Sequence, residues 1–344
     1  MTDKSEEVVI VGAVRTAIGT FNGSLKLIKA HQLGSMVISE VLKKSIFSGE
    51  EIDEGIMGQV LTSGSGQNPA RQAAISAGIS VSKPAFLVNQ VCGSGLRAVI
   101  LGYQSIRLGD VKNVISGGQE SMSLSPHSIL YRDKKKISEK ELVDTMINDG
   151  LIDAFNSYHM GVTAENVAKK FDISRQEQDQ FALNKKKKTQ EAIINKKFDE
   201  EIIKITRNGN TFGADEHPRT NLKLSDLEKL KTVFQENGTV TPGNSSGIND
   251  GAAALLLTTL EEAEKKSIEP LVKIVSWASV GVDPALMGLG PIEAVHKAVK
   301  KAKWRLEEVD LFEINEAFAS QSIAVIRELN IDQNKVNVNG GAIA

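Results

Sequence analysis

The sequence predicts an α/β fold with parallel strands, and three observations support this prediction. The chain has 344 residues, 41% of them hydrophobic and 24% charged, which is enough to bury substantial cores in two or three domains. A nearly continuous apolar run at Ala85 to Val91 is followed directly by a helical pattern and another strand, as in parallel sheets. A similar order of elements recurs near the end of the chain, so we expect two related halves.

The elements of the first half follow from the spacing of their apolar residues. The run Ala85 to Val91 predicts a strand that is buried on both faces. The following helix closes at Gly109, and the next strand leads into Gly117-Gly118. In chain order we expect a strand at Glu7 to Val11, helices at 30–47 and at Ala70 to Ala77, the strand at Ala85 to Val91, a helix from Leu96 to Ile106 and a strand at Val111 to Ile115.

From about Glu120 to Gly247 the pattern changes to polar loops and helices rich in Lys and Glu, which indicates an inserted domain. The run Lys185 to Lys188 is interpreted as a solvated helix face, with a phosphate-binding patch as the alternative. Beyond the insertion we expect strands at Ala252 to Leu257, Leu271 to Val275, Val309 to Ile314 and Val336 to Val338, and helices at Pro291 to Ala302 and Ser320 to Leu329.

Composition excludes several classes of function. The 41 basic and 43 acidic residues give a net charge of -2 with no pole of either sign, so a nucleic-acid partner is not expected. The single cysteine rules out an intramolecular disulfide and fits a reducing, cytoplasmic location. No apolar run approaches the length of a membrane span, and the polar, acidic start does not resemble a signal peptide, so no membrane partner is expected.

Cys92 is the first candidate for catalysis. A lone cysteine is often a small buried hydrophobic residue, but Cys92 lies where the strand turns into a helix. The helix dipole would lower the pKa of a thiol placed there, and the free N–H groups could hold an oxyanion. Gly93 and Gly95 leave room for a ligand, as the glycines beside a nucleophile elbow do. We therefore favour a nucleophile at Cys92.

Asn315 and Glu316 end an apolar strand at the matching corner of the second half, where Leu311 to Glu316 parallels Phe86 to Val91. They could be an ordinary helix cap, but the repeat favours a functional role, because open α/β sheets bind ligands at such corners. The run from Thr241 to Ala252 suits backbone contact with an elongated ligand, or serves as a loop between domains.

Histidines and glycine-rich runs give weaker signals. His159 lies on a loop before a helix start, and His217 is a weaker candidate. No ligand pattern accompanies either histidine, so no metal is expected. The segment Val8 to Gly19 resembles a dinucleotide loop, but Val14 replaces its second glycine, which argues against an NAD-dependent dehydrogenase.

Seven motifs in order resemble the thiolase family over essentially the whole chain. They are Val14-Arg-Thr-Ala-Ile-Gly, Asn89-Gln-Val-Cys-Gly-Ser-Gly-Leu, Gly117-Gly-Gln-Glu-Ser-Met, Tyr158-His-Met-Gly-Val-Thr-Ala-Glu-Asn, Gly243-Asn-Ser-Ser-Gly-Ile-Asn-Asp-Gly-Ala, Asn315-Glu-Ala-Phe and Asn339-Gly-Gly-Ala. The resemblance implies condensation of two acetyl-CoA molecules to acetoacetyl-CoA and CoA, or the reverse thiolysis, through an acetyl-Cys92 intermediate. CoA thioesters would be substrates, and no cofactor is implied.

The resemblance also implies a fold and an assembly. The fold would be a duplicated five-layer α/β core with an inserted loop domain that binds coenzyme A, in a homotetramer or dimer. The segment from about Ser123 to Asp144 resembles the tetramerisation loop. The implied domains are an N-terminal half at 1–121 and 248–270, the loop domain at 122–247 and an incomplete C-terminal half at 271–344.

The resemblance also implies roles for individual residues that match the family's motifs. Cys92 resembles the nucleophile, with its own N–H serving the acyl-enzyme oxyanion. Asn315 resembles the residue that holds an oxyanion-hole water, and His159 with Met160 matches the loop that lines the acyl pocket. The remaining residues would bind substrate: Ser246 at the pantetheine amide, Arg219 at the adenine, and Leu151, Phe234, Met287 and Phe318 around the pantetheine arm or acyl group.

The sequence departs from the family pattern at its end. Family members continue beyond Gly-Gly-Ala-Ile-Ala with a Leu-Gly-His-Pro segment and a Cys-Gly-Gly-Gly loop, neither of which follows Ala344. The resemblance assigns general-base chemistry to this His and Cys, and such groups are worth about 10² to 10⁴ in rate each. The expected alternative is a truncated, catalytically impaired thiolase that acts at most as a coenzyme A binding protein, or a fragment that does not fold stably alone.

Overall fold

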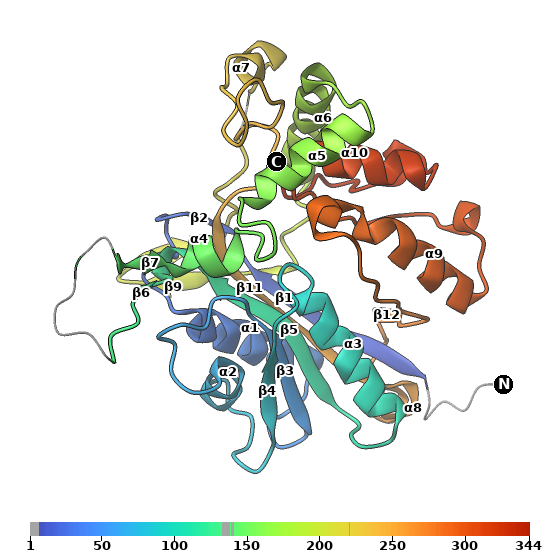
Figure 1. Ribbon diagram of the computed structural model, residues 1–344. Coiled ribbons are helices and arrows are strands. Elements are labelled where there is room, and N and C mark those ends of the chain that lie inside the picture. The colour runs from blue at the N-terminus through green and yellow to red at the C-terminus, as the bar shows by residue number, and fades with distance from the viewer. Residues whose placement is uncertain (1–6, 133–137, 139–140, 220) are drawn as a thin grey trace. The chain divides into compact units, whose positions relative to one another are not determined.

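The computed structural model describes residues 7–132, 138, 141–219 and 221–344, and it divides into two compact units (Figure 1). Unit 1 comprises Met1–Gly150, Glu200–Glu216 and Ile248–Ile274, and unit 2 comprises Leu151–Asp199, His217–Gly247 and Val275–Ala344. The domain bounds implied by the motifs differ from these units and stay a prediction. No helix among the described residues is long and apolar enough to cross a membrane.

Unit 1 is built on a mixed eight-stranded sheet. The order is β12-β1-β11-β5-β3-β4, with β2 paired to β11 and β8 paired to β1. Strands β5, β3 and β4 are parallel, whereas β11 runs antiparallel to β1 and β5. The strands are β1 (Val8–Thr16), β2 (Gly19–Thr20), β3 (Glu54–Gly58), β4 (Ala85–Val88), β5 (Val114–Ser121), β8 (Ile202–Ile203), β11 (Asn249–Thr259) and β12 (Val272–Lys273).

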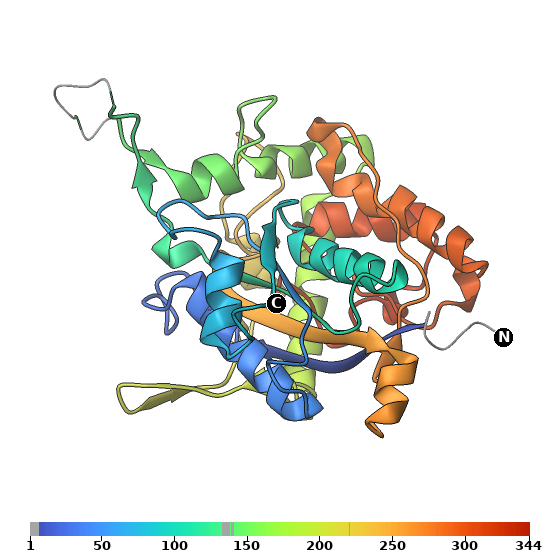
Figure 2. The ribbon, with the colours of Figure 1, turned by 90° about the horizontal axis from the view of Figure 1, so that it is seen from below.

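Helices cover both faces of this sheet (Figure 2). Helices α1 (Ala30–Ser45) and α2 (Pro69–Ser76) pack on one face, and α3 (Ser94–Arg107) packs on the other. The alternation of β1 explains the arrangement, because its successive side chains point to opposite faces. Val9 and Val11 join the core under α1, whereas Val8 and Ile10 join the core under α3. The predicted parallel strand-helix-strand unit β4-α3-β5 is confirmed.

The smaller elements of unit 1 lie between β5 and β11 or directly after β11. The pair β6 and β7 frames the segment that resembles the tetramerisation loop, of which residues 133–137 and 139–140 lie outside the described residues. These elements are the 3₁₀ turn Met122–Leu124, β6 (His127–Ser128), β7 (Val143–Asp144), α4 (Thr145–Gly150), the hairpin β9 (Ile205–Arg207) and β10 (Asn210–Phe212), and α8 (Leu260–Lys265).

Two strand predictions in unit 1 need correction. Strand β4 is not buried on both faces, because it is the edge strand next to β3 and Phe86 is 37% exposed. Strand β5 begins at Val114 and continues through Gly117-Gly118 instead of ending before them. Gly117 has to be glycine, because a Cβ there would lie 2.1 Å from the carbonyl oxygen of Ala253 on β11.

Glu120, near the end of β5, is a partly buried acid with a strongly shifted pKa. Its carboxylate accepts hydrogen bonds from the N–H of Val60 at 2.8 Å and of Leu61 at 3.3 Å. Burial nevertheless raises its pKa from 4.5 to about 7, with the N–H groups of Val60 and Leu61 opposing the rise.

We expect the free energy of unfolding to fall as the pH rises from 4.5 to about 7. The unfolded chain loses the Glu120 proton near pH 4.5, but the folded chain keeps it until about pH 7. The loss is up to about 3 kcal/mol, at about 1.4 kcal/mol for each pH unit. Urea titrations across this range should show the slope in the parent and not in Glu120→Gln. Equal slopes in both proteins would contradict the assignment.

Unit 2 is helical. Its core contains Val167, Phe181, Ala182, Ile323 and Ala324, which come from three helices. The elements are α5 (Met160–Lys170), α6 (Arg175–Ile194), α7 (Leu224–Glu228), α9 (Gly290–Ala302) and α10 (Ala319–Glu328), with 3₁₀ turns at Pro284–Leu289, Leu306–Glu308 and Gln333–Lys335. The helices predicted at Pro291 to Ala302 and Ser320 to Leu329 are confirmed as α9 and α10.

The strands predicted at Val309 to Ile314 and Val336 to Val338 do not form. In the part of unit 2 that the structure describes, these segments meet in a single parallel bridge between Phe312 and Val336. The pairing ends there because the next residue, Asn337, has a φ of 46°, which turns the backbone out of the extended conformation.

The interpretation of Lys185 to Lys188 as a solvated face is wrong for two of its residues. Lys185 is 1% exposed and Lys186 is 9% exposed. The ammonium group of Lys185 donates to the carbonyl oxygen of Val336, and that of Lys186 donates to the carbonyl oxygen of Ile343.

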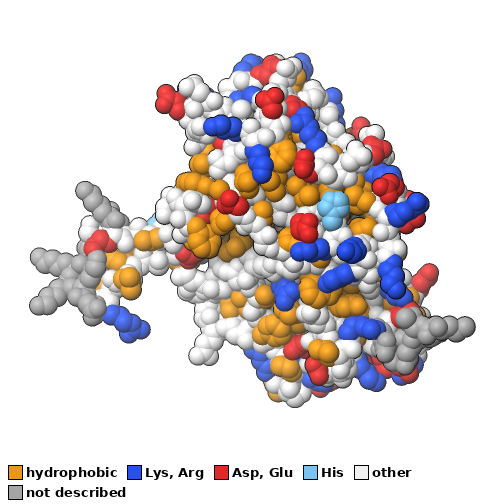
Figure 3. Space-filling view, turned by 45° about the vertical axis from the view of Figure 1, so that its right-hand side comes forward, with side chains coloured by type: hydrophobic (Ala, Val, Ile, Leu, Met, Phe, Trp, Pro, Cys, Tyr) orange, Lys and Arg blue, Asp and Glu red, His pale blue; other side chains and the backbone are white. Residues whose placement is uncertain are grey.

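Basic and acidic side chains are interspersed over the face of the molecule shown in Figure 3, in keeping with the net charge of -2.

Candidate active site

Cys92 lies in a strained turn between β4 and α3. The residue before it, Val91, has a φ of 48°, a conformation that is unfavourable for a β-branched side chain. Cys92 itself is exposed, and Gly93 is the N-cap of α3. Strain of this kind persists only where the surroundings enforce it, and it is concentrated at functional sites. The turn therefore resembles a nucleophile elbow, as the sequence suggested.

Ser94 enforces this turn, although no sequence pattern singles it out. Its Oγ donates to the carbonyl oxygen of Val91 at 2.6 Å and accepts from the N–H of Gln90 at 2.8 Å. The backbone of Ser94 also packs closely on β3, where a Cβ on Gly58 would lie 2.5 Å from its carbonyl carbon. A glycine at position 58 and a hydroxyl at position 94 together fix the position of Cys92.

The thiol of Cys92 does not behave as the helix dipole suggested. Desolvation by the atoms packed around the sulfur raises its pKa, and only its own backbone N–H acts in the opposite direction. This direction is opposite to the expected lowering of the pKa, because among the described residues no cationic side chain offsets the desolvation. The sulfur is accessible to a substrate, and desolvation disfavours its thiolate form.

His159 in unit 2 has a fixed orientation and protonation state. It is the N-cap of α5, and its Nδ1 accepts a hydrogen bond from the N–H of Gly161 at 3.0 Å. Its ring stacks on Phe234 with the centroids 4.5 Å apart, and desolvation lowers the pKa of the imidazole. His159 is therefore neutral at pH 7 with its proton on Nε2, which makes it a hydrogen-bond donor at that atom.

The structure brings together the apolar residues predicted to surround the substrate. Met160, Phe234, Met287 and Phe318 belong to one cluster, in which the ring centroids of Phe234 and Phe318 lie 6.1 Å apart edge to face. Leu151 is outside this cluster but adjoins it, since its carbonyl oxygen accepts from the N–H of Met160 at 2.8 Å. Phe234 thus links the ring of His159 to the Asn-Glu-Ala-Phe motif.

Asn315 is not a helix cap, because α10 begins at Ala319 and its N-cap is Phe318. The Asn315 side chain is exposed. The loop that carries Ser246 runs beside this motif: the N–H of Ser246 donates to the carbonyl oxygen of Ala317 at 3.0 Å. Ser246 is likewise exposed, so both side chains are free to meet a ligand.

Arg219 is exposed, and its positive charge acts on the neighbouring Lys186 and His217. Burial, followed by the charge of Arg219, lowers the pKa of Lys186 to about 8. Burial also lowers the pKa of His217, with smaller contributions from Lys186 and Arg219. The positive charges of Arg219 and Lys186 favour an anionic ligand, which agrees in sign with a nucleotide such as coenzyme A.

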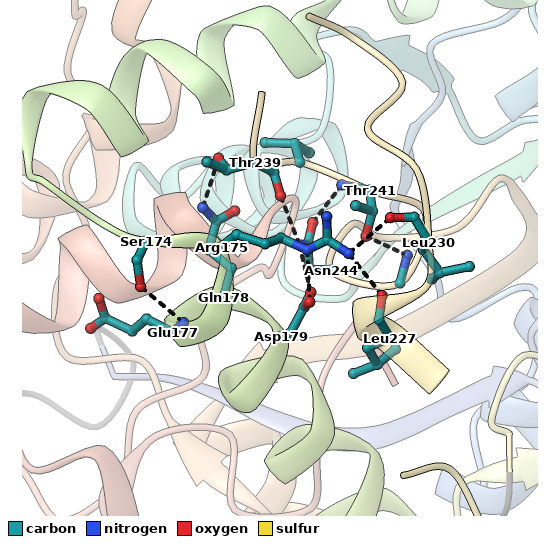
Figure 4. A network of polar contacts seen from close by, with 12 residues as sticks. Ser174, Arg175, Glu177, Gln178, Asp179, Leu227, Leu230, Thr239, Thr241 and Asn244 are labelled. Atoms are coloured by element: carbon teal, nitrogen blue, oxygen red, sulfur yellow. Dashed lines mark hydrogen bonds and ion pairs between the residues drawn. The ribbon is translucent and has the colours of Figure 1, made fainter. Parts of the chain in front are cut away.

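A buried polar network supports the loop that carries Ser246 (Figure 4). Asp179 on α6 is 0% exposed; it accepts from Arg175 Nε at 2.7 Å and from Asn244 Nδ2 at 2.9 Å. Asn244 also accepts from the N–H of Thr241 at 2.8 Å, and its own carbonyl oxygen accepts from Ala319. Nothing in the sequence singles out Asp179, since a polar helix does not mark which of its acids is buried.

The comparisons with known proteins agree with these motifs. The thiolase N-terminal domain family matches residues 8–261, and the thiolase C-terminal domain family matches residues 268–344. The acetyl-CoA acetyltransferase of Rhizobium meliloti (strain 1021) is 50% identical over 341 residues, which are 98% of this chain and 87% of that protein. The cytosolic acetyl-CoA acetyltransferase of Mus musculus is 49% identical over 350 residues, covering 100% of this chain and 88% of that protein.

A solved structure agrees as well. The crystal structure of the Bacillus anthracis acetyl-CoA acetyltransferase matches with a TM-score of 0.95 and 39% identity, over 98% of this chain and 87% of that chain. The comparisons do not bear out the expectation of a truncated, catalytically impaired protein. Both thiolase domain families match, and the fold is the mixed α/β thiolase fold. The chain belongs to the thiolase family.

Proposed function

We propose that the chain is an acetyl-CoA C-acetyltransferase that joins two acetyl-CoA molecules to acetoacetyl-CoA and CoA, or runs the reverse thiolysis. The observation that carries this proposal is the single cysteine, exposed on a strained turn that matches the family's nucleophile motif. Relatives about 50% identical are named acetyl-CoA acetyltransferase. The substrates are therefore acetyl-CoA, acetoacetyl-CoA and CoA.

The reaction takes place in two stages. The sulfur of Cys92 attacks the carbonyl carbon of acetyl-CoA, and the bond to the CoA sulfur breaks, so that the thiol proton leaves with CoA. A second acetyl-CoA then forms a carbon–carbon bond from its methyl carbon to the acetyl carbon, and the bond from that carbon to the Cys92 sulfur breaks. The proton lost from the methyl group ends on the Cys92 sulfur, which restores the thiol. The Nε2–H of His159 and the amide of Asn315 serve the thioester oxygens, directly or through water.

Acetylation in the absence of turnover tests the proposal. Incubation with acetyl-CoA should add one acetyl group to the chain, and peptide mapping should locate it on Cys92. Thiolysis of acetoacetyl-CoA should be measured in the same preparation. Binding of CoA with neither acetylation nor thiolysis would overturn the proposal.

Two substitutions of His159 distinguish its role as the N-cap of α5 from its role as a hydrogen-bond donor to substrate. In His159→Asn the side-chain oxygen still caps α5, but the Nε2–H donor is lost, so kcat should fall on the order of 10²-fold with little change in stability. In His159→Ala the same loss should come with about 1 kcal/mol of destabilisation. Steady-state thiolysis and thermal unfolding measure the two effects. A fully active His159→Asn would exclude the donor role.

Assembly and location are also proposed. A homotetramer or dimer is supported by the family resemblance of residues 123–144, and sedimentation of the purified protein would test it. A cytoplasmic location is supported by the single cysteine and by the name of the mouse relative.

A further inference from the structure

A buried side chain joins the loop at 336–343 to the segment that carries Asn315. Asn337 is 1% exposed, and its amide makes three hydrogen bonds. Its Oδ1 accepts from the N–H of Ile314 at 2.8 Å, and its Nδ2 donates to the carbonyl oxygen of Ile314 at 2.8 Å and to Glu316 Oε1 at 2.7 Å. The residues on both sides of Asn315 are therefore bound to one amide group.

The conformation of Asn337 makes this pairing possible. The segment before Asn315 and the segment before Asn337 pair through their backbones. The N–H of Phe312 donates to the carbonyl oxygen of Lys335 at 2.9 Å, and the N–H of Asn337 donates to the carbonyl oxygen of Phe312 at 2.8 Å. The φ of 46° at Asn337 then turns the backbone away. Its side-chain amide takes the place of the next peptide group, because it offers one donor and one acceptor to Ile314.

Glu316 anchors the far end of this arrangement. It is 1% exposed and forms an ion pair with the buried Lys185, 3.4 Å from Nζ to Oε1. Lys185 in turn donates to the carbonyl oxygen of Val336 at 2.8 Å, next to Asn337. Gly341 is required here, because a Cβ at that position would lie 2.3 Å from the Glu316 carboxylate. The side chains of Lys185, Glu316 and Asn337 are all buried and hydrogen-bonded, so the arrangement is rigid.

Asn315 differs from both of its neighbours. Its side chain is exposed and forms no hydrogen bond with another described residue of the chain. We infer that Asn337, through its hydrogen bonds to Ile314 and Glu316, is a positioning residue that fixes the direction of the Asn315 amide before substrate binds. This inference rests on the proposed function, in which Asn315 serves a thioester oxygen. A donor that is held in place in advance needs no reorganisation during the reaction.

Asn337→Gly is the test, because glycine adopts the left-handed conformation freely and the variant loses only the amide. We expect kcat for acetoacetyl-CoA thiolysis to fall on the order of 10- to 100-fold, with KM changed less than threefold, since a displaced catalytic group costs rate. In an Asn315→Ala background the same change should cause no further loss, because Asn337 acts through Asn315. Asn337→Asp, which places a carboxylate against Glu316, should be at least as slow.

Asn330→Gly is the matched control. Asn330 is exposed and also has a left-handed backbone, with a φ of 50°, so the chemical change is the same and the activity should be unchanged. An unchanged kcat in Asn337→Gly, or an additional loss in the Asn315→Ala background, would overturn the inference.

A separate measurement distinguishes this inference from the proposed function. If the parent protein neither becomes acetylated nor catalyses thiolysis, the proposed function fails. Amide hydrogen exchange at Ile314 then tests whether Asn337 holds the segment. The exchange rate should be lower in the parent than in Asn337→Gly, because Oδ1 of Asn337 accepts from the N–H of Ile314. Equal exchange rates would show that the amide does not hold the segment.

Discussion

Replacing Cys92 with alanine should abolish acetyl transfer, with a rate loss on the order of 10⁴- to 10⁶-fold, as expected when a covalent nucleophile is removed. The chain has no second cysteine to take over the acetyl group. Cys92→Ser keeps the shape of the side chain, but a hydroxyl is a far weaker nucleophile than a thiolate at neutral pH. Mass measurement after incubation with acetyl-CoA, together with steady-state thiolysis, should detect neither acetylation nor turnover in the alanine variant.

The stability of the Cys92 variants is the control. Because the side chain is exposed, Cys92→Ala should unfold at nearly the same urea concentration as the parent. The raised pKa of the thiol also predicts that acetylation of the parent accelerates as the pH rises above neutrality. Stoichiometric acetylation of Cys92→Ala at another residue would contradict the assignment.

Replacing Asp179 with alanine should lower the free energy of unfolding by about 3 kcal/mol, the lower end of the cost of removing one partner from a buried ion pair, because Arg175 is partly exposed. Asp179 is 0% exposed, and its loss leaves Arg175 and Asn244 without their shared acceptor. Asn244 holds the loop that carries Ser246, so activity should fall as well. Urea titration of the purified variant measures the stability, and thiolysis measures the activity.

A matched control lies on the same helix. Glu177 forms an exposed ion pair with Arg327, and such pairs contribute about 0 to 1 kcal/mol. Glu177→Gln should therefore leave stability and activity close to those of the parent. If Asp179→Ala were no more destabilising than Glu177→Gln, the buried network would not be a source of stability for this unit.

Local sequence patterns were sufficient for part of the fold and part of the site. The apolar spacing of 30–47 and of Leu96 to Ile106 predicts α1 and α3, because one face of each helix has to be buried. The corner at Cys92 follows from a strand, two glycines and a helix start in succession. The strain at Val91 and the hydroxyl of Ser94 that maintains it were not predicted, since both depend on the three-dimensional path of the turn.

The sequence by itself determined the alternation of strands and helices, the nucleophile motif and the family, because these depend on neighbouring residues. The tertiary structure decided which polar residues are buried, since their partners are distant in the chain. Lys185 and Val336 are 151 residues apart, and a lysine in a run of four has no local sign of burial. Only the folded chain shows that Lys185, Glu316 and Asn337 meet, and that Asn315 is exposed beside them.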